Sequence, residues 1–251
     1  ATAMVFEPQP EELFTPDNAP ARLSLLRDKY VQLKALGVDR LLCLKFDKRF
    51  ASFTAEQFVE QLLVEDLGVQ FLVVGDDFRF GKGRVGNFAM LQAEGQKCGF
   101  SVVSTQSFRL DDYRISSTEV RKALSEDNFT LAEKMLGRPF TISGKVLHGD
   151  KKGRTIGFPT ANLLLKRCNA PINGVFAVQV DIAGTIYSGV ANIGTRPTVN
   201  GQRSQLEVHI FHFTGNLYGR FISVAIRAKL RNEIKFDSFE QLHQQILRDA
   251  E

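Results

Sequence analysis

The sequence contains no tryptophan and only three cysteines and four histidines among its 251 residues. The cysteines are scattered and odd in number, so they predict neither a disulfide framework nor a zinc site, and they fit a reducing cytoplasm. No apolar run approaches the roughly 20 residues that a membrane helix requires. The first ten residues have no basic segment and no long apolar stretch, and they therefore do not predict a signal peptide.

An excess of positive charge is also missing from the first half of the chain. Residues 1–137 hold 17 basic and 20 acidic side chains, whereas residues 138–251 hold 15 and 8, a net charge of +7. This second part is where phosphate or a nucleic acid is expected to bind. A solvated basic face would have the same charge, so that alternative stays open at this point.

Helix and strand patterns alternate over residues 1–137, a stretch that opens with a strand-like run at 3–6. Further strands are predicted at 38–46, 69–74 and 100–104, and helices at 20–36, 54–67 and 88–97. Helix caps are predicted at Asp17 or Asn18, at Asn87, and at capping boxes of Thr54 with Gln57, Ser116 with Glu119, and Thr130 with Glu133. Alternating elements with apolar strands predict an α/β domain, with a parallel sheet covered by helices.

The pattern changes near residue 138. Short strand-like runs follow at 140–147, 175–182, 185–192, 204–213 and 220–230, separated by turn residues. Helical spacing returns only at 238–248, where Ser238 and Gln241 form a capping box. Residues 138–251 are therefore predicted to form an antiparallel β-barrel with one terminal helix.

The segment GKGRVG (81–86) matches the G-x-G-x-x-G dinucleotide fingerprint. In that fingerprint the glycines directly follow a strand and open a helix, whereas GDDFRF (75–80) intervenes here. A nicotinamide or flavin Rossmann site is therefore not favoured. A glycine-rich loop near a nucleotide remains open.

Residues 149–155, GDKKGRT, combine glycines with cations. Gly149 and Gly153 allow backbone N–H groups to approach phosphate oxygens, and Arg154 would offset their charge. An ordinary basic turn would use the same residues. The following segment contains Thr160 and Asn162, which share one face of a predicted strand and offer hard, neutral oxygens of the kind that Mg²⁺ binds. Such a pair can also serve a turn, but beside a phosphate-binding loop we favour a magnesium site.

Phosphoryl transfer also requires a group that orients the attacking hydroxyl. Glu207, in the alternating strand 205–213, could act as this base, or it could be a surface glutamate. His209 and His212 are three residues apart and point to opposite faces of the strand, which is poor geometry for one metal ion. Ser116 and Arg121, at a predicted helix start, suit either an anion or simple capping.

Eight segments give the sequence a family resemblance. They are VFEPQP (5–10), VVGDDFRFG (73–81), RISSTEVR (114–121), GRTIGFPTANL (153–163), NGVFAV (173–178), GVANIGTRPTV (189–199), LEVHIF (206–211) and LRNEIKFDS (230–238). In this order, over nearly the whole chain, they resemble the bacterial bifunctional riboflavin kinase/FAD synthetases. The resemblance implies a Rossmann-like nucleotidyltransferase domain at 1–137 and a riboflavin kinase β-barrel at 138–251. It also implies conversion of riboflavin to FMN with ATP and Mg²⁺, and joining of AMP to FMN to give FAD.

The resemblance also implies roles for individual residues. In the kinase, Thr160 and Asn162 would bind Mg²⁺, and Glu207 would be the catalytic base. The ATP phosphates would lie against Gly149 and Arg154, with Gly153 in the same loop. The nucleotide would lie near Tyr218, and the flavin would lie near Arg231. The nucleotide of the adenylyltransferase would lie against Asp77, Ser116, Thr118 and Arg121.

One feature of the family is missing from this sequence. The family's first module opens with a strand and a loop bearing H-x-G-H, but none of the four histidines lies in such a motif or in residues 1–137. We therefore expect this strand and loop to be missing, and we expect kinase activity without FMN adenylylation. His212 stands where relatives often carry an acid, and we have no physical account of it.

The sequence is also compatible with two other classes of function. It does not indicate an oligomeric state. The basic second half and its strand aromatics also allow a nucleic-acid-binding β-barrel, which would bind RNA with steep salt dependence. A scaffold with vestigial sites is a third possibility. The enzyme hypothesis predicts a cytoplasmic protein with small-molecule substrates, without nucleic-acid or membrane partners.

Overall fold

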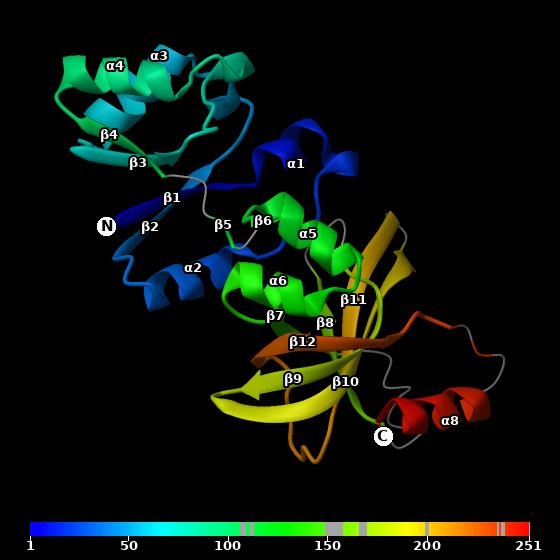
Figure 1. Ribbon diagram of the computed structural model, residues 1–251. Coiled ribbons are helices and arrows are strands. Elements are labelled where there is room, and N and C mark those ends of the chain that lie inside the picture. The colour runs from blue at the N-terminus through cyan, green and yellow to red at the C-terminus, as the bar shows by residue number, and fades with distance from the viewer. Residues whose placement is uncertain are drawn as a thin grey trace. The chain divides into compact units, whose positions relative to one another are not determined.

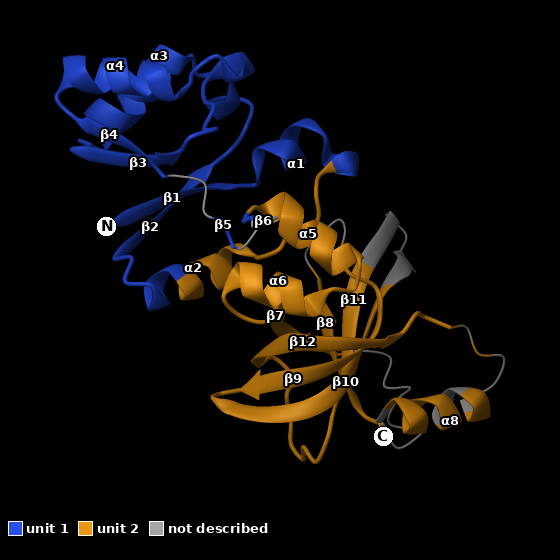
Figure 2. Ribbon diagram, viewed as in Figure 1, with its two compact units in different colours: residues 1–18, 33–115 blue, residues 19–32, 116–251 orange. Residues whose placement is uncertain are grey.

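A computed structural model describes residues 1–105, 109–110, 113–148, 158–165, 170–198, 201–234, 236 and 239–250. The chain divides into two compact units, one formed by residues 1–18 and 33–115 and the other by residues 19–32 and 116–251 (Figure 2). No helix in these ranges is both long enough and apolar enough to cross a membrane.

Unit 1 is an α/β unit with two pairs of parallel strands (Figure 1). β1 (Thr2–Glu7) pairs with β2 (Arg40–Lys45), and β3 (Phe71–Gly75) pairs with β4 (Ser101–Thr105). The short β5 (Arg109–Leu110) and β6 (Tyr113–Arg114) are antiparallel. Its helices are α1 (Pro10–Phe14), η1 (Pro16–Asn18), η2 (Phe50–Ser52), α3 (Ala55–Gln57), η3 (Phe58–Asp66), η4 (Lys82–Arg84) and α4 (Phe88–Cys98).

The core of unit 1 forms where α3, η3 and α4 pack against the strands. Ala55, Val59 and Leu91 are completely buried, and Phe58 and Phe80 are nearly so. Thr54 and Gln57 form the predicted capping box ahead of α3, and Asn87 caps α4 by accepting a hydrogen bond from Met90 N. Polar caps satisfy the free N–H groups at a helix start, so these boundaries follow from local sequence.

Two helix starts differ from the prediction. The helix predicted at 20–36 is α2 (Leu26–Ala35), and Asp17 and Asn18 lie in η1 instead of capping it. Asp28 takes the capping role there, because its carboxylate accepts a hydrogen bond from Leu25 N at 2.9 Å. The predicted Thr130 box is also wrong, because Asn128 caps α6 (Phe129–Leu136) through Leu131 N. Ser116 caps α5 (Ser117–Ser125) as expected.

Unit 2 contains a closed barrel of six antiparallel strands in the order β10-β11-β8-β7-β12-β9. The strands are β7 (Thr141–Leu147), β8 (Thr160–Leu164), β9 (Gly174–Ile182), β10 (Thr185–Thr198), β11 (Gly201–Ile210) and β12 (Phe221–Arg231), followed by helix α8 (Phe239–Ala250). Closure leaves no open sheet edge. β11 ends at Ile210 instead of 213, because a turn at 211–212 places His212 at a φ of 54°.

Apolar side chains that alternate along the strands fill the barrel. Leu163, Phe176 and Leu206 are completely buried, and α6 adds Phe129, whose ring meets that of Phe176 edge-on at 5.8 Å. With a period of two, the intervening residues face away from this core. The sequence pattern therefore decides which residues of β8 and β11 are available to a substrate.

Candidate functional site

The candidate kinase site lies on the outward face of strands β8, β11 and β10, which are neighbours in the barrel (Figure 1). Ala161 and Leu163 of β8 point into the core, so Thr160 and Asn162 share the opposite face. Leu206 and Val208 of β11 are buried in the same way, which leaves Glu207 half-buried on the outward face. The three side chains predicted from the sequence to bind metal or act as base therefore lie on one surface.

Asn162 and Glu207 are direct partners in the antiparallel register of β8 and β11. Gln205 connects them, because its Nε2 donates to Asn162 Oδ1 at 2.6 Å and to Glu207 Oε1 at 3.1 Å. Asn162 Nδ2 donates to the backbone oxygen of Thr160 at 3.3 Å. These bonds hold the Asn162 amide with its oxygen toward Gln205 and its nitrogen toward the backbone oxygen of Thr160.

Thr160 is the register partner of His209 on β11. The His209 ring lies 3.0 Å from the carbonyl oxygen of Pro159 through Nδ1, and it meets Phe158 edge-on. These contacts fix the start of β8 against β11. His212 is exposed in the turn beyond the end of β11, so the prediction that the two histidines point to opposite faces of one strand does not apply to it.

The donor set fits Mg²⁺ better than a transition metal. Within the described ranges, no three His, Cys, Asp or Glu side chains are grouped so that they could hold a metal ion. Thr160 and Asn162 instead offer a hydroxyl and an amide oxygen on one face of β8, next to the Glu207 carboxylate. Magnesium usually binds few protein oxygens and completes its shell with water and substrate phosphates.

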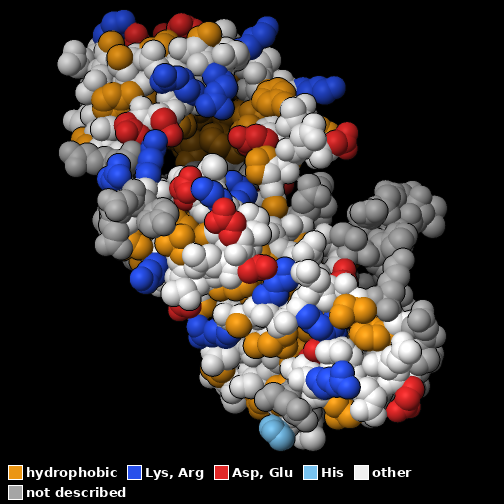
Figure 3. Space-filling model, turned by 45° about the vertical axis from the view of Figure 1, so that its right-hand side comes forward, with side chains coloured by type: hydrophobic (Ala, Val, Ile, Leu, Met, Phe, Trp, Pro, Cys, Tyr) orange, Lys and Arg blue, Asp and Glu red, His pale blue; other side chains and the backbone are white. Residues whose placement is uncertain are grey.

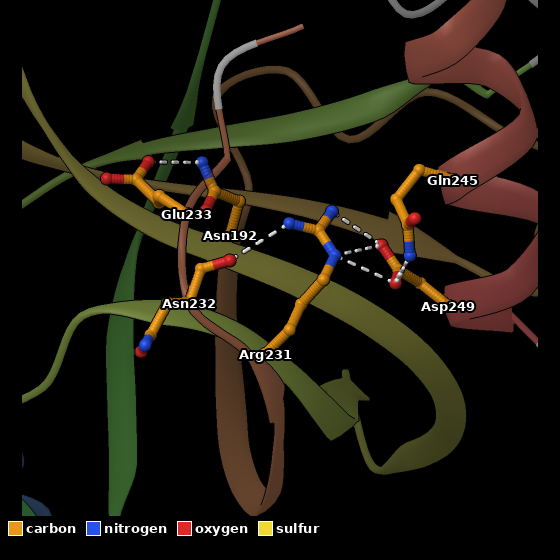
Figure 4. Close-up of polar contacts among 6 residues, drawn as sticks. All are labelled: Asn192, Arg231, Asn232, Glu233, Gln245 and Asp249. Carbon is orange, nitrogen blue, oxygen red and sulfur yellow. Dashed lines mark hydrogen bonds and ion pairs between the residues drawn. The ribbon is translucent and has the colours of Figure 1, made fainter.

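A second carboxylate reaches the same face from the segment after β12. Asn192, the register partner of Glu207 on β10, donates from Nδ2 to Glu233 Oε1 at 3.0 Å (Figure 4). Glu233 lies directly over Gly194, where a Cβ would come within 2.1 Å of Oε1. Only a glycine on β10 permits this approach. Asn192 Oδ1 is buried and has no hydrogen-bond partner among the described residues.

Arg231 ends β12 and forms a two-pronged ion pair with Asp249 of α8 (Figure 4). Its Nε and Nη2 donate to the Asp249 carboxylate at 2.9 and 2.7 Å. The side chains are 17% and 5% exposed, so the pair is largely buried. Gln245 Nε2 donates to the same carboxylate at 2.9 Å. The guanidinium predicted to lie near the flavin is thus engaged with the C-terminal helix.

The predicted ATP-binding loop can be followed only at its start. Gly149, Gly153 and Arg154 lie outside the described residues. Tyr218 stacks on His148, with ring centroids 3.8 Å apart and planes inclined by 24°. Because His148 directly precedes Gly149, this aromatic pair marks where the loop begins.

Unit 1 contains a cavity of about 540 Å³ lined with phenylalanine. A hollow with a hydrophobic floor and charged side chains at its rim is visible in the upper part of the space-filling view (Figure 3). Its aromatic lining consists of Phe6, Phe14, Phe46, Phe50, Phe53, Phe58, Phe78 and Phe80. Arg79 and Arg84 also line it. Its size and lining are typical of a site for a flat, largely apolar ligand.

A capping carboxylate fixes one wall of this cavity. Asp47 Oδ1 accepts a hydrogen bond from Phe50 N at 2.9 Å at the start of η2. That bond, with a smaller contribution from the charge of Lys45, lowers the pKa of Asp47 below its ordinary value. η2 then carries Phe50 into stacking contact with Phe53 at 5.3 Å.

The four residues predicted to bind the adenylyltransferase nucleotide fall in both units. Asp77, in unit 1, accepts a hydrogen bond from Arg114 Nη2 at 3.4 Å. Ser116, Thr118 and Arg121 belong to unit 2. Ser116 Oγ accepts from Glu119 N at 3.2 Å, which is a capping contact, and Arg121 Nε donates to the backbone oxygen of Ala21 at 2.7 Å.

Sequence reasoning missed Gln205, Glu233 and Asp249. Gln205 is two residues before Glu207 and so shares its face, a signal that was available from strand period. Glu233 and Asp249 depend on long-range packing, which no local pattern reveals. The phenylalanine cavity had a compositional signal, since the chain contains 21 phenylalanines.

Comparisons with known proteins identify two family matches along the chain. A family model for FAD synthetase matches residues 1–119, and one for riboflavin kinase matches residues 136–251. The "Bifunctional riboflavin kinase/FMN adenylyltransferase" of Escherichia coli strain K12 is 56% identical over 247 residues, which are 98% of this chain and 79% of that protein. The protein of the same name from Haemophilus influenzae is 53% identical over 249 residues, 99% of this chain and 81% of that one.

One solved structure supports the fold over the whole chain. The "Crystal Structure of Macrolide-efflux Protein from Streptococcus pneumoniae" superposes with a TM-score of 0.77 at 31% identity. The match covers 99% of this chain and 81% of that one. None of these matches supports the nucleic-acid-binding alternative.

Proposed function

Because the chain belongs to the bifunctional riboflavin kinase/FMN adenylyltransferase family, with both enzyme domains present, we propose that its barrel moves the γ-phosphate of ATP to riboflavin in a Mg²⁺-dependent reaction. One observation carries the assignment of the site. Asn162 and Glu207 are register partners joined by Gln205, with Thr160 on the same face. This arrangement sets two neutral oxygens beside one carboxylate.

In the proposed mechanism, Glu207 accepts the proton of the ribityl 5′-hydroxyl as this oxygen forms a bond to the γ-phosphorus. The bond from that phosphorus to the ADP oxygen then breaks. Thr160 and Asn162 would hold Mg²⁺, which would offset charge on the phosphate oxygens. Positioning and charge stabilisation supply most of the rate, and no covalent enzyme intermediate is needed.

The remaining kinase residues are proposed from the sequence. Gly149, Gly153 and Arg154 would bind the ATP phosphates, with the Tyr218–His148 pair close to the start of their loop. Arg231 was predicted on the flavin side. Its ion pair with Asp249 supports an indirect role there, in which Arg231 fixes the segment that carries Glu233.

Unit 1 is of FMN adenylyltransferase type, but because the sequence contains no H-x-G-H motif we still expect it not to adenylylate FMN. We propose that its phenylalanine cavity takes the isoalloxazine ring of FMN, with Arg79 or Arg84 at the 5′-phosphate, because the volume and aromatic lining suit a flat ring and the arginines suit an anion. The family resemblance implies nucleotide-binding roles for Asp77 in unit 1 and for Ser116, Thr118 and Arg121 in unit 2.

We keep the domain boundary at 137/138 as a proposal. It agrees with the start of the riboflavin kinase match at residue 136, although α5 and α6 belong to the same compact unit as the barrel. Since the reaction consumes ATP and the cysteines predict no disulfide framework, we also propose that the protein works in the cytoplasm.

Chromatography of the products formed from riboflavin, ATP and Mg²⁺ tests the proposed function. We expect FMN to form at a rate that falls to background when Mg²⁺ is chelated. The proposal would be overturned if folded protein formed no FMN, or if chelation left the rate unchanged.

A further inference from the structure

Gln205 occupies a distinctive position on the outward face of the barrel. It lies on β11 two residues before Glu207 and is half-buried, so it shares the face of the candidate base. Its register partners are Leu164 of β8 and Gly194 of β10. Glu233 fills the space over Gly194, and the carboxamide of Gln205 reaches toward Asn162 of β8.

The two N–H groups of this carboxamide serve two different acceptors. Nε2 lies 2.6 Å from Asn162 Oδ1 and 3.1 Å from Glu207 Oε1. An NH₂ group has two hydrogens, so both can be used at once. The acceptors are a proposed metal ligand and the proposed base, both oxygens that would otherwise repel each other across the strand pair.

We propose that Gln205 is a positioning residue of the kinase reaction, whose one carboxamide sets the orientation of the Asn162 amide and of the Glu207 carboxylate. This inference rests on the proposed function of Thr160, Asn162 and Glu207. The inference adds that Gln205 aligns the cation and the attacking hydroxyl through Asn162 and Glu207, without contacting either of them.

Two physical consequences follow from the geometry. Without the Gln205 donor, the Asn162 amide can turn its NH₂ group toward a cation, which an amide nitrogen does not bind. The Glu207 carboxylate would also lose a contact that limits its rotation. Partners of metal ligands typically contribute about 10- to 100-fold to metal affinity or activity, and small misplacement of reacting groups can cost about 10²-fold in rate.

The test compares Gln205→Leu with Gln179→Leu. Gln179 is also half-buried on a strand of the same barrel, and its Oε1 accepts from Arg227 at 2.7 Å, away from the candidate site. Three quantities are measured for each protein: turnover, the dissociation constant of riboflavin from quenching of flavin fluorescence, and Mn²⁺ affinity by electron paramagnetic resonance with a non-hydrolysable ATP analogue.

For Gln205→Leu we expect turnover and Mn²⁺ affinity each to fall by about 10- to 100-fold. Riboflavin affinity should change by no more than about two-fold, since the flavin is not held by the lost hydrogen bonds. Gln179→Leu should leave all three quantities near wild type. Should Gln205→Leu fail to fold, Gln205→Met, which keeps the length of the side chain and removes its donors, carries the same expectations.

Two results would overturn the inference. In one, turnover and Mn²⁺ affinity of the Gln205 variants are both unchanged. In the other, riboflavin affinity falls in parallel with turnover, which would make Gln205 a substrate contact. Asn162→Ala and Glu207→Gln, measured alongside, distinguish failure of the proposed kinase site from failure of the Gln205 role. If these two variants behave like the wild type, the proposed site is wrong. If they are impaired and the Gln205 variants are not, only the role of Gln205 is wrong.

Discussion

Asn162 and Glu207 face each other across strands β8 and β11 as register partners, and a single side chain, Gln205, donates to both. The pairing brings together residues 45 positions apart in the sequence. Neither residue alone specifies a reaction. Together with Thr160, they combine metal-binding oxygens with a base, as phosphoryl transfer to a hydroxyl requires.

The first prediction concerns the metal. Thr160→Ala and Asn162→Ala each remove one proposed oxygen ligand, so the Mg²⁺ concentration that gives half-maximal turnover should rise by about 10-fold or more. Thr185→Ala, at the exposed start of β10, is the matched control and should not change it. An unchanged Mg²⁺ requirement in both site variants would remove these residues from the metal site.

The second prediction concerns the Arg231–Asp249 ion pair. Asp249→Asn leaves a largely buried guanidinium without its counter-charge, which should destabilise the docking of α8 by about 3 kcal/mol. Amide hydrogen exchange over residues 239–250 measures this opening. Glu133→Gln, which breaks the half-exposed pair with Arg227, should cost less than about 1 kcal/mol. Equal losses of stability in Asp249→Asn and Glu133→Gln would contradict the conclusion that the Arg231–Asp249 pair is the more buried of the two.

The third prediction compares two glycines that line the phenylalanine cavity. Gly81 has φ 73° and ψ 168°, a conformation almost restricted to glycine, and a Cβ there would lie 2.6 Å from Ala55 N. Gly83 has φ 69° and ψ 9°, with its nearest neighbour for a Cβ at 3.8 Å.

Gly81→Ala should therefore lower the free energy of unfolding of unit 1 by about 3 kcal/mol, and Gly83→Ala by about 1 kcal/mol. Urea denaturation followed by a probe in unit 1 measures both. A larger loss in the free energy of unfolding for Gly83→Ala than for Gly81→Ala would contradict the described backbone geometry of these two glycines.

The barrel strands were predictable because their pattern is local. Alternation of apolar and polar residues placed Glu207 on the outward face, and the cap of α4 by Asn87 followed from one side chain. The cap of α6 was mispredicted, because Asn128 and Thr130 are both acceptable caps and the contacts of Phe129 with the barrel decide where the helix begins.

The neighbourhood of the site was less predictable, because it depends on contacts distant in sequence. Glu233 reaches Asn192 because the chain after β12 crosses the end of β9, where Val175 is the register partner of both Arg231 and Asn192, and because Gly194 leaves space. Arg231 was predicted beside the flavin from resemblance, but the position of its partner, Asp249, depends on how α8 packs. Neither contact has a signal in residue spacing.

Replacement of Glu207 by glutamine is the most direct measurement, because it keeps the size of the side chain and removes the proposed base. Turnover of riboflavin to FMN should fall by roughly 10²–10⁴, while the riboflavin dissociation constant, from flavin fluorescence, stays near that of the wild type. Wild-type turnover in Glu207→Gln would contradict a kinase site built on Thr160, Asn162 and Glu207.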